Sequence, residues 1–516
     1  MLDGSGSGKS SAYSMPNAYQ CLGSYIFTDP KGEIYDRTAG YLKQNGYEIK
    51  VLNLVRPQYS DGYNPLMHIS SELDVDVIAN TIVKGQSVEG KQDPYWDDMS
   101  EMLLKALIYY LIATRPEEEQ NLASCAELVR AANNNGGSNL LTDLISQLPY
   151  DHPARMYYKS IEIATEKTYS SILSSLQSKL GKFDSKEIAE LTSTDTIDFE
   201  EIGNKKTAVY VISSDTHGAY DFLLTIFFSQ MIQQLYDHAD RNGGRLKERT
   251  FFILDEFANI GRIPDFDKKI STSRSRGISF SVILQNLDQL EAIYEKSYET
   301  IMGNCDTHLF FGSNSFKTAE YFSKQLGERT IGRDNISINK DKHNMKTGKS
   351  ISDNIMGRSL LTPDELRRMD NDDCIIFVKG IKPVKAKKYW YYKYPMAKEM
   401  AALEISHNDI GEIERGAWRK YNPYNPYVEE KDEKQPENLV VESLDDLFED
   451  VDINEAENQE RTEIKEEQNN DLNLFDIDED MEQPDFFQEN EETDDYDLQK
   501  ELEAKFDELF GSVDED

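Results

Sequence analysis

Short apolar runs and amphipathic stretches alternate along the first sixty positions of this chain of 516 residues. The runs 23–28 and 47–54 are rich in β-branched and aromatic residues, which favours strands. The stretches 11–22 and 34–45 space their apolar residues as a helix does. Strands that alternate with short helices are typical of a parallel α/β sheet with helices on its faces.

The pattern changes after position 92. Helical spacing without strand signals predicts helices at 96–114, 121–133, 140–147 and 154–180. Strand patterns resume afterwards and predict strands at 207–213, 250–256, 279–284, 307–312 and 374–378, with a long helix at 217–241. The polar, lysine-containing stretch 329–358 is expected to be a long loop. We therefore predict an α/β domain in two parts, 1–92 and 194–423, an all-α insertion at 93–193, and a tail at 424–516.

The charge of the chain is concentrated in that tail. Of the formal net charge of −39, residues 428–516 contribute −31, from 37 acidic and six basic residues. Such a segment buries too little apolar surface to fold alone, so we expect disorder. Its apolar islands at 444–448, 472–475 and 506–510 fit short helices that fold on a partner, or a purely solubilising tail.

The composition argues against a zinc-binding, disulfide-rich, secreted or membrane-spanning protein. The four cysteines lie far apart, which suggests neither a zinc site nor a disulfide framework and fits a reducing compartment. No signal peptide is visible, and the apolar runs 102–113 and 222–231 are too short to span a bilayer.

A glycine-rich loop near the start carries the first candidate chemistry. It consists of Gly4, Ser5, Gly6, Ser7, Gly8, Lys9 and Ser10. Backbone N–H groups of such a loop cradle nucleotide phosphates, the lysine reaches the β and γ oxygens, and the hydroxyl of Ser10 would bind Mg²⁺. Asp3 stands where the pattern has its first glycine. A solvated Gly/Ser-rich tail is the alternative interpretation.

A second motif supports the first. The apolar run 251–254 ends in Asp255 and Glu256, which is typical of a buried parallel strand that ends at a site. Asp255 would hold the Mg²⁺ and Glu256 would orient a water for attack on the γ-phosphate of ATP. Alone, the run could be an ordinary strand end; together with Lys9 and Ser10 it predicts an ATPase.

The order of motifs resembles the VirD4/TraG coupling proteins, the ATPases of conjugative type IV secretion systems. The resemblance rests on the loop 4–10, on the signatures at 28–33, 51–54, 63–66, 254–257 and 361–366, and on Gln285, and it covers about 3–395. It implies a RecA-like P-loop NTPase with an inserted all-α domain, using ATP and Mg²⁺. The family works as a homo-hexamer at the cytoplasmic face of the membrane. There it receives a relaxase–DNA complex, with single- or double-stranded DNA, and delivers it to the secretion channel.

The resemblance also assigns roles to single residues. Lys9 and Ser10 match the phosphate and magnesium groups, Asp255 and Glu256 match the Walker B pair, and Gln285 matches a γ-phosphate sensor. Arg274 matches an arginine finger that acts across the subunit interface. Gln285 could instead cap the next helix, and Arg274 could belong to a solvated or phosphate-binding basic face.

Two departures from the family pattern lead to expectations. Family members normally begin with transmembrane helices and with a strand before the phosphate loop, and the sequence is interpreted as lacking both. A sheet without that strand would have a gap at its centre. The leading hypothesis is therefore a DNA-translocation motor, and the alternative is a non-hydrolysing docking platform for relaxase or accessory proteins. A chromosome-partitioning or repair translocase shares the ATP motifs, but the signatures at 28–33 and 63–66 argue against it.

Overall fold

The computed structural model describes residues 1–3, 6–85, 94–133, 140–214, 218, 220–340 and 347–426. The chain divides into two compact units, Met1–Val428 and Glu429–Asp516. The second unit, with the apolar islands of the predicted tail, lies outside the described residues. So do Gly4 and Ser5 of the glycine-rich loop.

A five-stranded parallel sheet forms the framework of this unit. Its order is β3-β4-β2-β5-β6, and its strands are β2 (Ser24–Thr28), β3 (Glu48–Asn53), β4 (Thr207–Ile212), β5 (Thr250–Leu254) and β6 (Ile278–Val282). Both faces of the sheet are buried, as successive residues of β2 show: Tyr25 and Phe27 pack in the hydrophobic cluster on one face, and Ile26 packs in the cluster on the other. The five predicted strands are thus found, each within a few residues of its expected ends.

A second sheet continues the first. Its order is β1-β7-β10-β11, with strands β1 (Leu2–Asp3), β7 (Thr307–Gly312), β10 (Asp373–Val378) and β11 (Val384–Lys387). β1 runs parallel to β7, whereas β10 is antiparallel to both of its neighbours. The backbone of Met1 reaches the other sheet: its N–H donates to Val282 O at 2.6 Å, and its carbonyl accepts from Leu284 N at 3.0 Å. The expectation of a central gap is therefore wrong, because the first three residues lie between β6 and β7 and bond to both sides.

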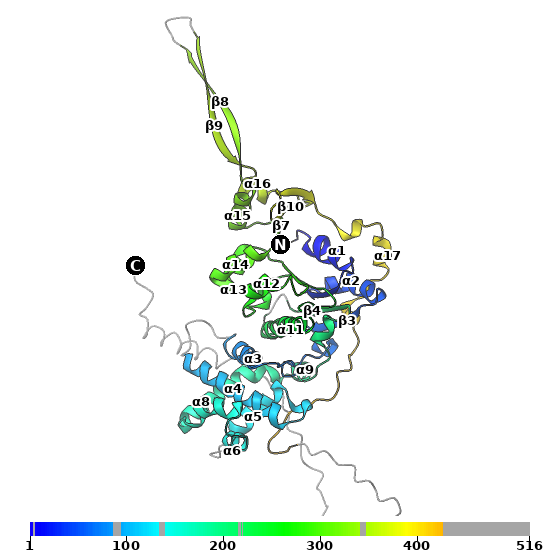
Figure 1. The fold of residues 1–516 in the computed structure, drawn as a ribbon, viewed down its shortest axis with the longest axis vertical. Coiled ribbons are helices and arrows are strands. Elements are labelled where there is room, and N and C mark those ends of the chain that lie inside the picture. The colour runs from blue at the N-terminus through cyan, green and yellow to red at the C-terminus, as the bar shows by residue number, and fades with distance from the viewer. Residues whose placement is uncertain are drawn as a thin grey trace, which may run out of the picture. The chain divides into compact units, whose positions relative to one another are not determined.

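Helices cover both faces of these sheets (Figure 1). One face carries the helical turn η1 (Ser10–Ser14), α1 (Met15–Ala18) and α2 (Glu33–Gln44). On the other face lie α11 (Asp221–Arg241), α12 (Phe266–Thr272), α13 (Leu287–Tyr294), α14 (Tyr298–Asn304), α15 (Phe316–Leu326) and α16 (Pro363–Arg367). Short 3₁₀ turns connect several elements: η2 (Pro57–Tyr59), η3 (Glu117–Glu119), η4 (Gly181–Asp184), η5 (Phe257–Ile260) and η6 (Glu295–Ser297).

The segment between β3 and β4 is helical, and its described residues form no strand. Its helices are α3 (Glu72–Lys84), α4 (Pro94–Thr114), α5 (Leu122–Asn133), α6 (Leu140–Ser146), α7 (Pro153–Glu162), α8 (Glu166–Leu180), α9 (Lys186–Leu191) and α10 (Phe199–Ile202). The helix predicted at 154–180 is in fact two, because Thr165 starts a new helix by accepting a hydrogen bond from Thr168 N. Helix α3 was not predicted, and the domain boundaries at 93 and 193 stay a prediction.

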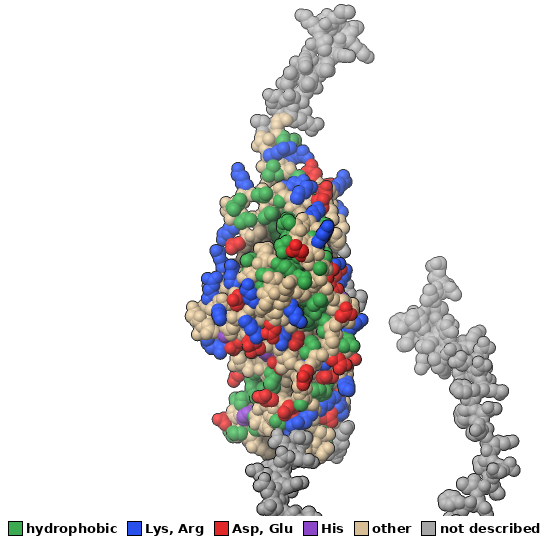
Figure 2. All heavy atoms as spheres, turned by 90° about the vertical axis from the view of Figure 1, so that its right-hand side faces the viewer, with side chains coloured by type: hydrophobic (Ala, Val, Ile, Leu, Met, Phe, Trp, Pro, Cys, Tyr) green, Lys and Arg blue, Asp and Glu red, His purple; other side chains and the backbone are tan. Residues whose placement is uncertain are grey.

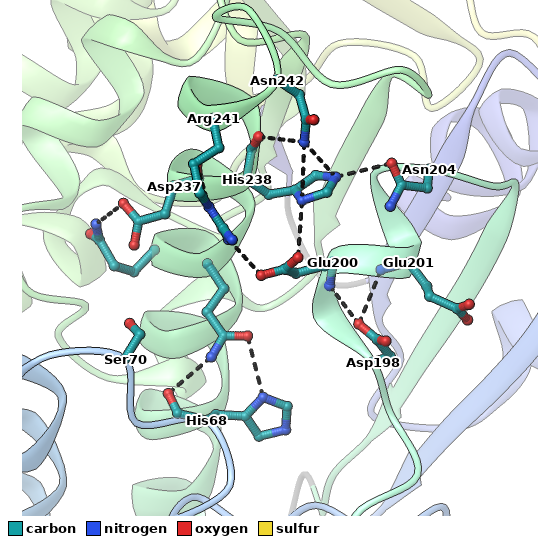
Figure 3. A network of polar contacts seen from close by, with 12 residues as sticks. His68, Ser70, Asp198, Glu200, Glu201, Asn204, Asp237, His238, Arg241 and Asn242 are labelled. Carbon is teal, nitrogen blue, oxygen red and sulfur yellow. Dashed lines mark hydrogen bonds and ion pairs between the residues drawn. The ribbon is translucent and has the colours of Figure 1, made fainter.

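The chain enters and leaves this helical segment beside α11. Tyr63 donates to Gln230 Oε1 at 2.6 Å, and Gln234 donates to His68 O at 2.9 Å. His68 on the outgoing segment also contacts Asp195 on the returning one, at 2.9 Å. Figure 3 shows the neighbouring network, in which His238 of α11 lies between Glu200 and Asn204 of the returning chain. The signature at 63–66 therefore holds the junction of sheet and helices, away from the carboxyl ends of the strands.

The stretch predicted as a long loop at 329–358 is an antiparallel hairpin. It consists of β8 (Glu328–Lys340) and β9 (Thr347–Ser359), with Ile336 opposite Ile351 in the register (Figure 1). The correction has a physical reason, since β8 contains the alternating run Ile336-Ser337-Ile338 and β9 contains Ile351 and Ile355, and β-branched residues favour strand pairing.

After β11 the chain returns across the face of α1 and α2. This C-terminal strap (residues 388–407) contains η7 (Tyr391–Lys393) and α17 (Ala397–Ala401), and η8 (His407–Asp409) begins at its last residue. Figure 2 shows this side of the molecule, with hydrophobic and basic side chains together in its upper half. Among the described residues, no helix is both long and apolar enough to cross a membrane.

Candidate nucleotide-binding site

Several polar side chains meet at the carboxyl edge of the parallel sheet. Asp29 follows β2, Asp255 and Glu256 follow β5, and Gln285 follows β6. In open α/β sheets this edge is where ligands bind. A cavity of about 590 Å³ opens there, and it is lined by Gly6, Gly8, Lys9, Ser10, Ser11, Asp29, Pro30, Lys31, Glu33, Asp255, Glu256, Asn259, Gln285 and Gln289.

The described part of the phosphate loop has the backbone that its glycines allow. Gly6 and Gly8 have φ of +80° and +85°, in the left-handed region that residues with a side chain rarely adopt. Lys9 directly precedes the helical turn η1, which Ser10 begins, and Ala12 N donates to Gly8 O at 2.7 Å. The loop thus leads directly into a helix N-terminus, which favours bound anions.

The two sequence motifs lie in contact. Lys9 Nζ lies 3.2 Å from Asp255 Oδ1 and also donates to Glu256. Ser10 Oγ donates to Asp255 Oδ2 at 3.3 Å. Thr28, at the end of β2, fixes the backbone there by donating to Asp255 O at 2.6 Å. The loop and the strand end therefore form one charged site.

Glu256 turns toward the cavity because the chain bends sharply after β5. Its φ of +50° is in the left-handed region, and its N–H is held by Asp255 Oδ1 at 2.9 Å. Strain of this kind costs about 1–3 kcal/mol and clusters at functional sites. The bend places the carboxylate of Glu256 beside Lys9 and Gln285.

Gln285 contacts that carboxylate directly. Its Nε2 donates to Glu256 Oε1 at 2.9 Å and to Oε2 at 3.1 Å. The alternative role as a helix cap does not hold, because Asn286 caps α13 by accepting from Gln289 N. Gln289 in turn accepts from Gln285 N at 2.9 Å, so it holds the sensor candidate in place.

Burial and charge shift the acidity of three groups in the site. Burial raises the pKa of Asp255, although Lys9 opposes this effect. Burial lowers the pKa of Lys9, but Asp255 and Glu256 more than offset it, so that its pKa lies above the ordinary value. Burial also raises the pKa of Asp29 to about 7, against backbone N–H bonds from Tyr35 and Ile34. Lys9 is therefore fully charged at neutral pH, as phosphate binding requires.

Arg274 lies away from this cavity. Its side chain is 92% exposed and lies 3.5 Å from Asp306. Arg276, two residues on, donates from Nε and from Nη2 to the two carboxylate oxygens of Asp240, each at 2.8 Å. Arg274 therefore does not reach the phosphate loop of its own chain.

Sequence reasoning missed several residues that line the cavity. Asn259 and Gln289 carried no recognisable signal, since each follows a motif by a few positions within a helix or turn. Asp29 and Glu33 lie within the signature at 28–33, which could have been assigned to the site from its position after a predicted strand. Both line the cavity, as does Lys31 of the same signature.

The residues present suit a magnesium nucleotide. Mg²⁺ prefers hard oxygen ligands, and the hydroxyl of Ser10 and the carboxylate of Asp255 are such donors only 3.3 Å apart. The loop supplies a lysine and a helix N-terminus for phosphates. The cavity volume of 590 Å³ is in the usual range for ligands of nucleotide size.

Comparison with known proteins assigns the chain to a family. The family model described as type IV secretory system conjugative DNA transfer matches residues 1–410. The chain belongs to this family of conjugative coupling proteins. This finding confirms the resemblance that the motif order indicated.

Individual relatives are distant. Conjugal transfer protein TraG of Escherichia coli is 24% identical over 434 residues, covering 77% of this chain and 67% of TraG. Protein VirD4 of Agrobacterium fabrum (strain C58 / ATCC 33970) is 24% identical over 421 residues, covering 77% of this chain and 59% of VirD4. The chain thus spans about two thirds or less of the length of these relatives.

Solved structures confirm the RecA-like fold. The bacterial conjugative coupling protein TrwBdeltaN70 aligns with a TM-score of 0.53 at 18% identity, covering 75% of this chain and 83% of that one. Another structure, of plasmid coupling protein TrwB in complex with ADP and Mg²⁺, has the same TM-score, identity and coverage. At this identity the likeness concerns the fold alone.

Proposed function

We propose that this chain is an ATP-driven motor of conjugative DNA transfer. It binds ATP with Mg²⁺ at the carboxyl edge of the sheet, hydrolyses the γ-phosphate, and uses the work to hand a relaxase–DNA complex to a type IV secretion channel. One observation carries the proposal most strongly. Lys9, Asp255, Glu256 and Gln285 meet in a single cavity, although three different elements supply them.

Each side chain has a role that follows from its chemistry. The backbone of the phosphate loop and Lys9 bind and orient the phosphates. Mg²⁺, held by Ser10 and Asp255, would neutralise charge on the transferred group. Glu256 orients the attacking water and accepts its proton, and Gln285 positions that carboxylate through its two hydrogen bonds.

The motor is expected to act as a homo-hexamer at the cytoplasmic face of the membrane. Arg274 supports this part of the proposal, because a guanidinium that is exposed and remote from its own cavity is free to enter the site of a neighbouring subunit. DNA and the channel proteins are the partners that membership of the family implies.

The test is an ATP hydrolysis assay of the purified chain, with and without DNA, beside Lys9→Ala. The parent should hydrolyse ATP faster when DNA is present, and Lys9→Ala should abolish both binding and turnover. Nucleotide binding by the parent without turnover, at any protein or DNA concentration, would favour the docking platform. Absence of binding would overturn the assignment of the site.

A further inference from the structure

The C-terminal strap (residues 388–407) contacts both walls of the nucleotide cavity. One wall is the phosphate loop and the other is the start of α2. Within the strap, η7 contacts η1 after the loop, and α17 lies beside α2 (Figure 1). The strap lies near the end of the described chain, and neither the motifs nor the proposed mechanism gives it a role.

Lys388 holds the phosphate loop from behind. Its side chain is buried, at 5% exposure. Its Nζ donates to Ser7 O at 2.9 Å and to Phe311 O at 2.9 Å. Since Ser7 lies in the loop and Phe311 on β7, one ammonium group ties the loop to the strand beside β1. Hydrogen bonds from a charged donor are about twice as strong as neutral ones.

Trp390 packs on the same loop. A Cβ added to Gly8 would lie 2.2 Å from Trp390 Cζ3, so the ring is in direct contact with the glycine backbone. The indole N–H donates to Asp372 Oδ1 at 3.1 Å, which fixes the ring. The left-handed backbone of Gly8 is thereby supported by a residue far away in the sequence.

The far end of the strap holds the opposite wall. His407 donates from its backbone N to Asp36 Oδ1 at 2.5 Å, and its Nδ1 lies 2.9 Å from the same oxygen. A Cβ at Gly32 would lie 2.5 Å from His407 Nδ1. Gly32 stands between Lys31 and Glu33, both of which line the cavity.

We propose that Lys388 and Trp390 are positioning residues for the bound nucleotide. They hold the phosphate loop in its binding conformation, so that little ordering remains to be done when phosphates bind, and the buried ammonium adds positive charge behind the loop. This inference rests on the proposed function only in taking ATP as the ligand. The hold on the loop itself is a property of the protein without nucleotide.

The first measurement is the affinity for Mg·ATP and Mg·ADP by titration calorimetry. Lys388→Met should weaken both at least tenfold, whereas Lys388→Arg should recover part of the loss because it keeps the charge. Lys385→Met is the matched control, since Lys385 lies on β11 only three residues before Lys388 but is exposed and pairs with Asp373. It should bind within twofold of the parent.

The second measurement is amide hydrogen exchange of the loop in nucleotide-free protein. Lys388→Met should speed exchange in a peptide covering 6–14 and leave 250–254 unchanged. Affinity within twofold of the control, or unchanged exchange in the loop, would overturn the inference. If the parent does not bind ATP, the proposed function fails and the exchange data alone decide the inference. Should Lys388→Met not fold, the same two measurements on Trp390→Leu decide it.

Discussion

Ser10 Oγ donates a hydrogen bond to Asp255 Oδ2 at 3.3 Å, across 245 positions of the sequence. Ser10 begins the helical turn after the phosphate loop, and Asp255 follows β5. The contact exists because β1 and β5 end at the same edge of the combined sheet. It brings the two motifs into one site, which the following predictions test.

Glu256→Gln should bind ATP but lose hydrolysis. The amide keeps the size and the contact with Gln285 but cannot accept a proton from water. We expect a fall in turnover of about 10²-fold or more, with ATP affinity little changed. Steady-state hydrolysis and equilibrium binding check this. Glu291→Gln is the control, because Glu291 lies on α13 and pairs with Lys317. Parental turnover in Glu256→Gln would remove Glu256 from the catalytic role.

Arg274 should act in a neighbouring subunit. Arg274→Ala and Lys9→Ala should each abolish hydrolysis. Mixing the two variants should partly restore it, because some interfaces then combine the intact Lys9 of one subunit with the intact Arg274 of its neighbour. Arginine fingers contribute ~10³–10⁵ in rate. Arg276→Ala is the control, because Arg276 is held by Asp240 and should affect stability more than turnover. No rescue in assemblies shown to be mixed would contradict the assignment.

Asp29 should make the protein less stable as the pH rises. Its pKa is about 7 in the folded protein and 3.8 ordinarily. The folded state therefore keeps a proton that the unfolded chain releases, and this contribution to stability is fully present below pH 3.8 and lost as the pH rises through 7. Asp29→Asn keeps an oxygen for the N–H of Tyr35 but has no proton to lose.

The measurement is the free energy of unfolding of Asp29→Asn and of the parent at pH 5 and pH 8. Relative to the parent, the variant should gain roughly 2.6 kcal/mol between these values, because the parent loses about 1.4 kcal/mol for each pH unit up to the folded pKa of about 7. A difference that does not change with pH would mean that Asp29 is already ionised in the folded protein.

DNA should bind through the hairpin of β8 and β9. Lys340 lies on β8, opposite Thr347 of β9, and Lys349 lies on β9, opposite Ile338 of β8. Replacing both by Gln should weaken binding for all DNA sequences and reduce the slope of log K against log salt by roughly 1.5–2, as expected for two lost phosphate contacts. Lys317→Gln, whose ammonium pairs with Asp288 and Glu291, should leave the slope unchanged.

Much of the site could be predicted from the sequence because its motifs are local. Lys9, Asp255 and Glu256 each stand next to a glycine-rich loop or an apolar run, and the order of motifs identified the family. The alternation of strands and helices likewise predicted the parallel sheet. The loop predicted at 329–358 was wrong because its few β-branched residues are spread among many polar ones, and the pairing of β8 with β9 stabilises the strands.

The sequence by itself determined which residues could bind a nucleotide and which family they belong to, since these properties are carried by short segments. Only the tertiary structure decided that Met1 joins β6 to β7 and that Lys388 reaches Ser7. Both contacts join segments hundreds of residues apart, and each ends on a backbone carbonyl. Because every residue carries the same backbone groups, no side-chain pattern marks such partners, and only the fold brings them together.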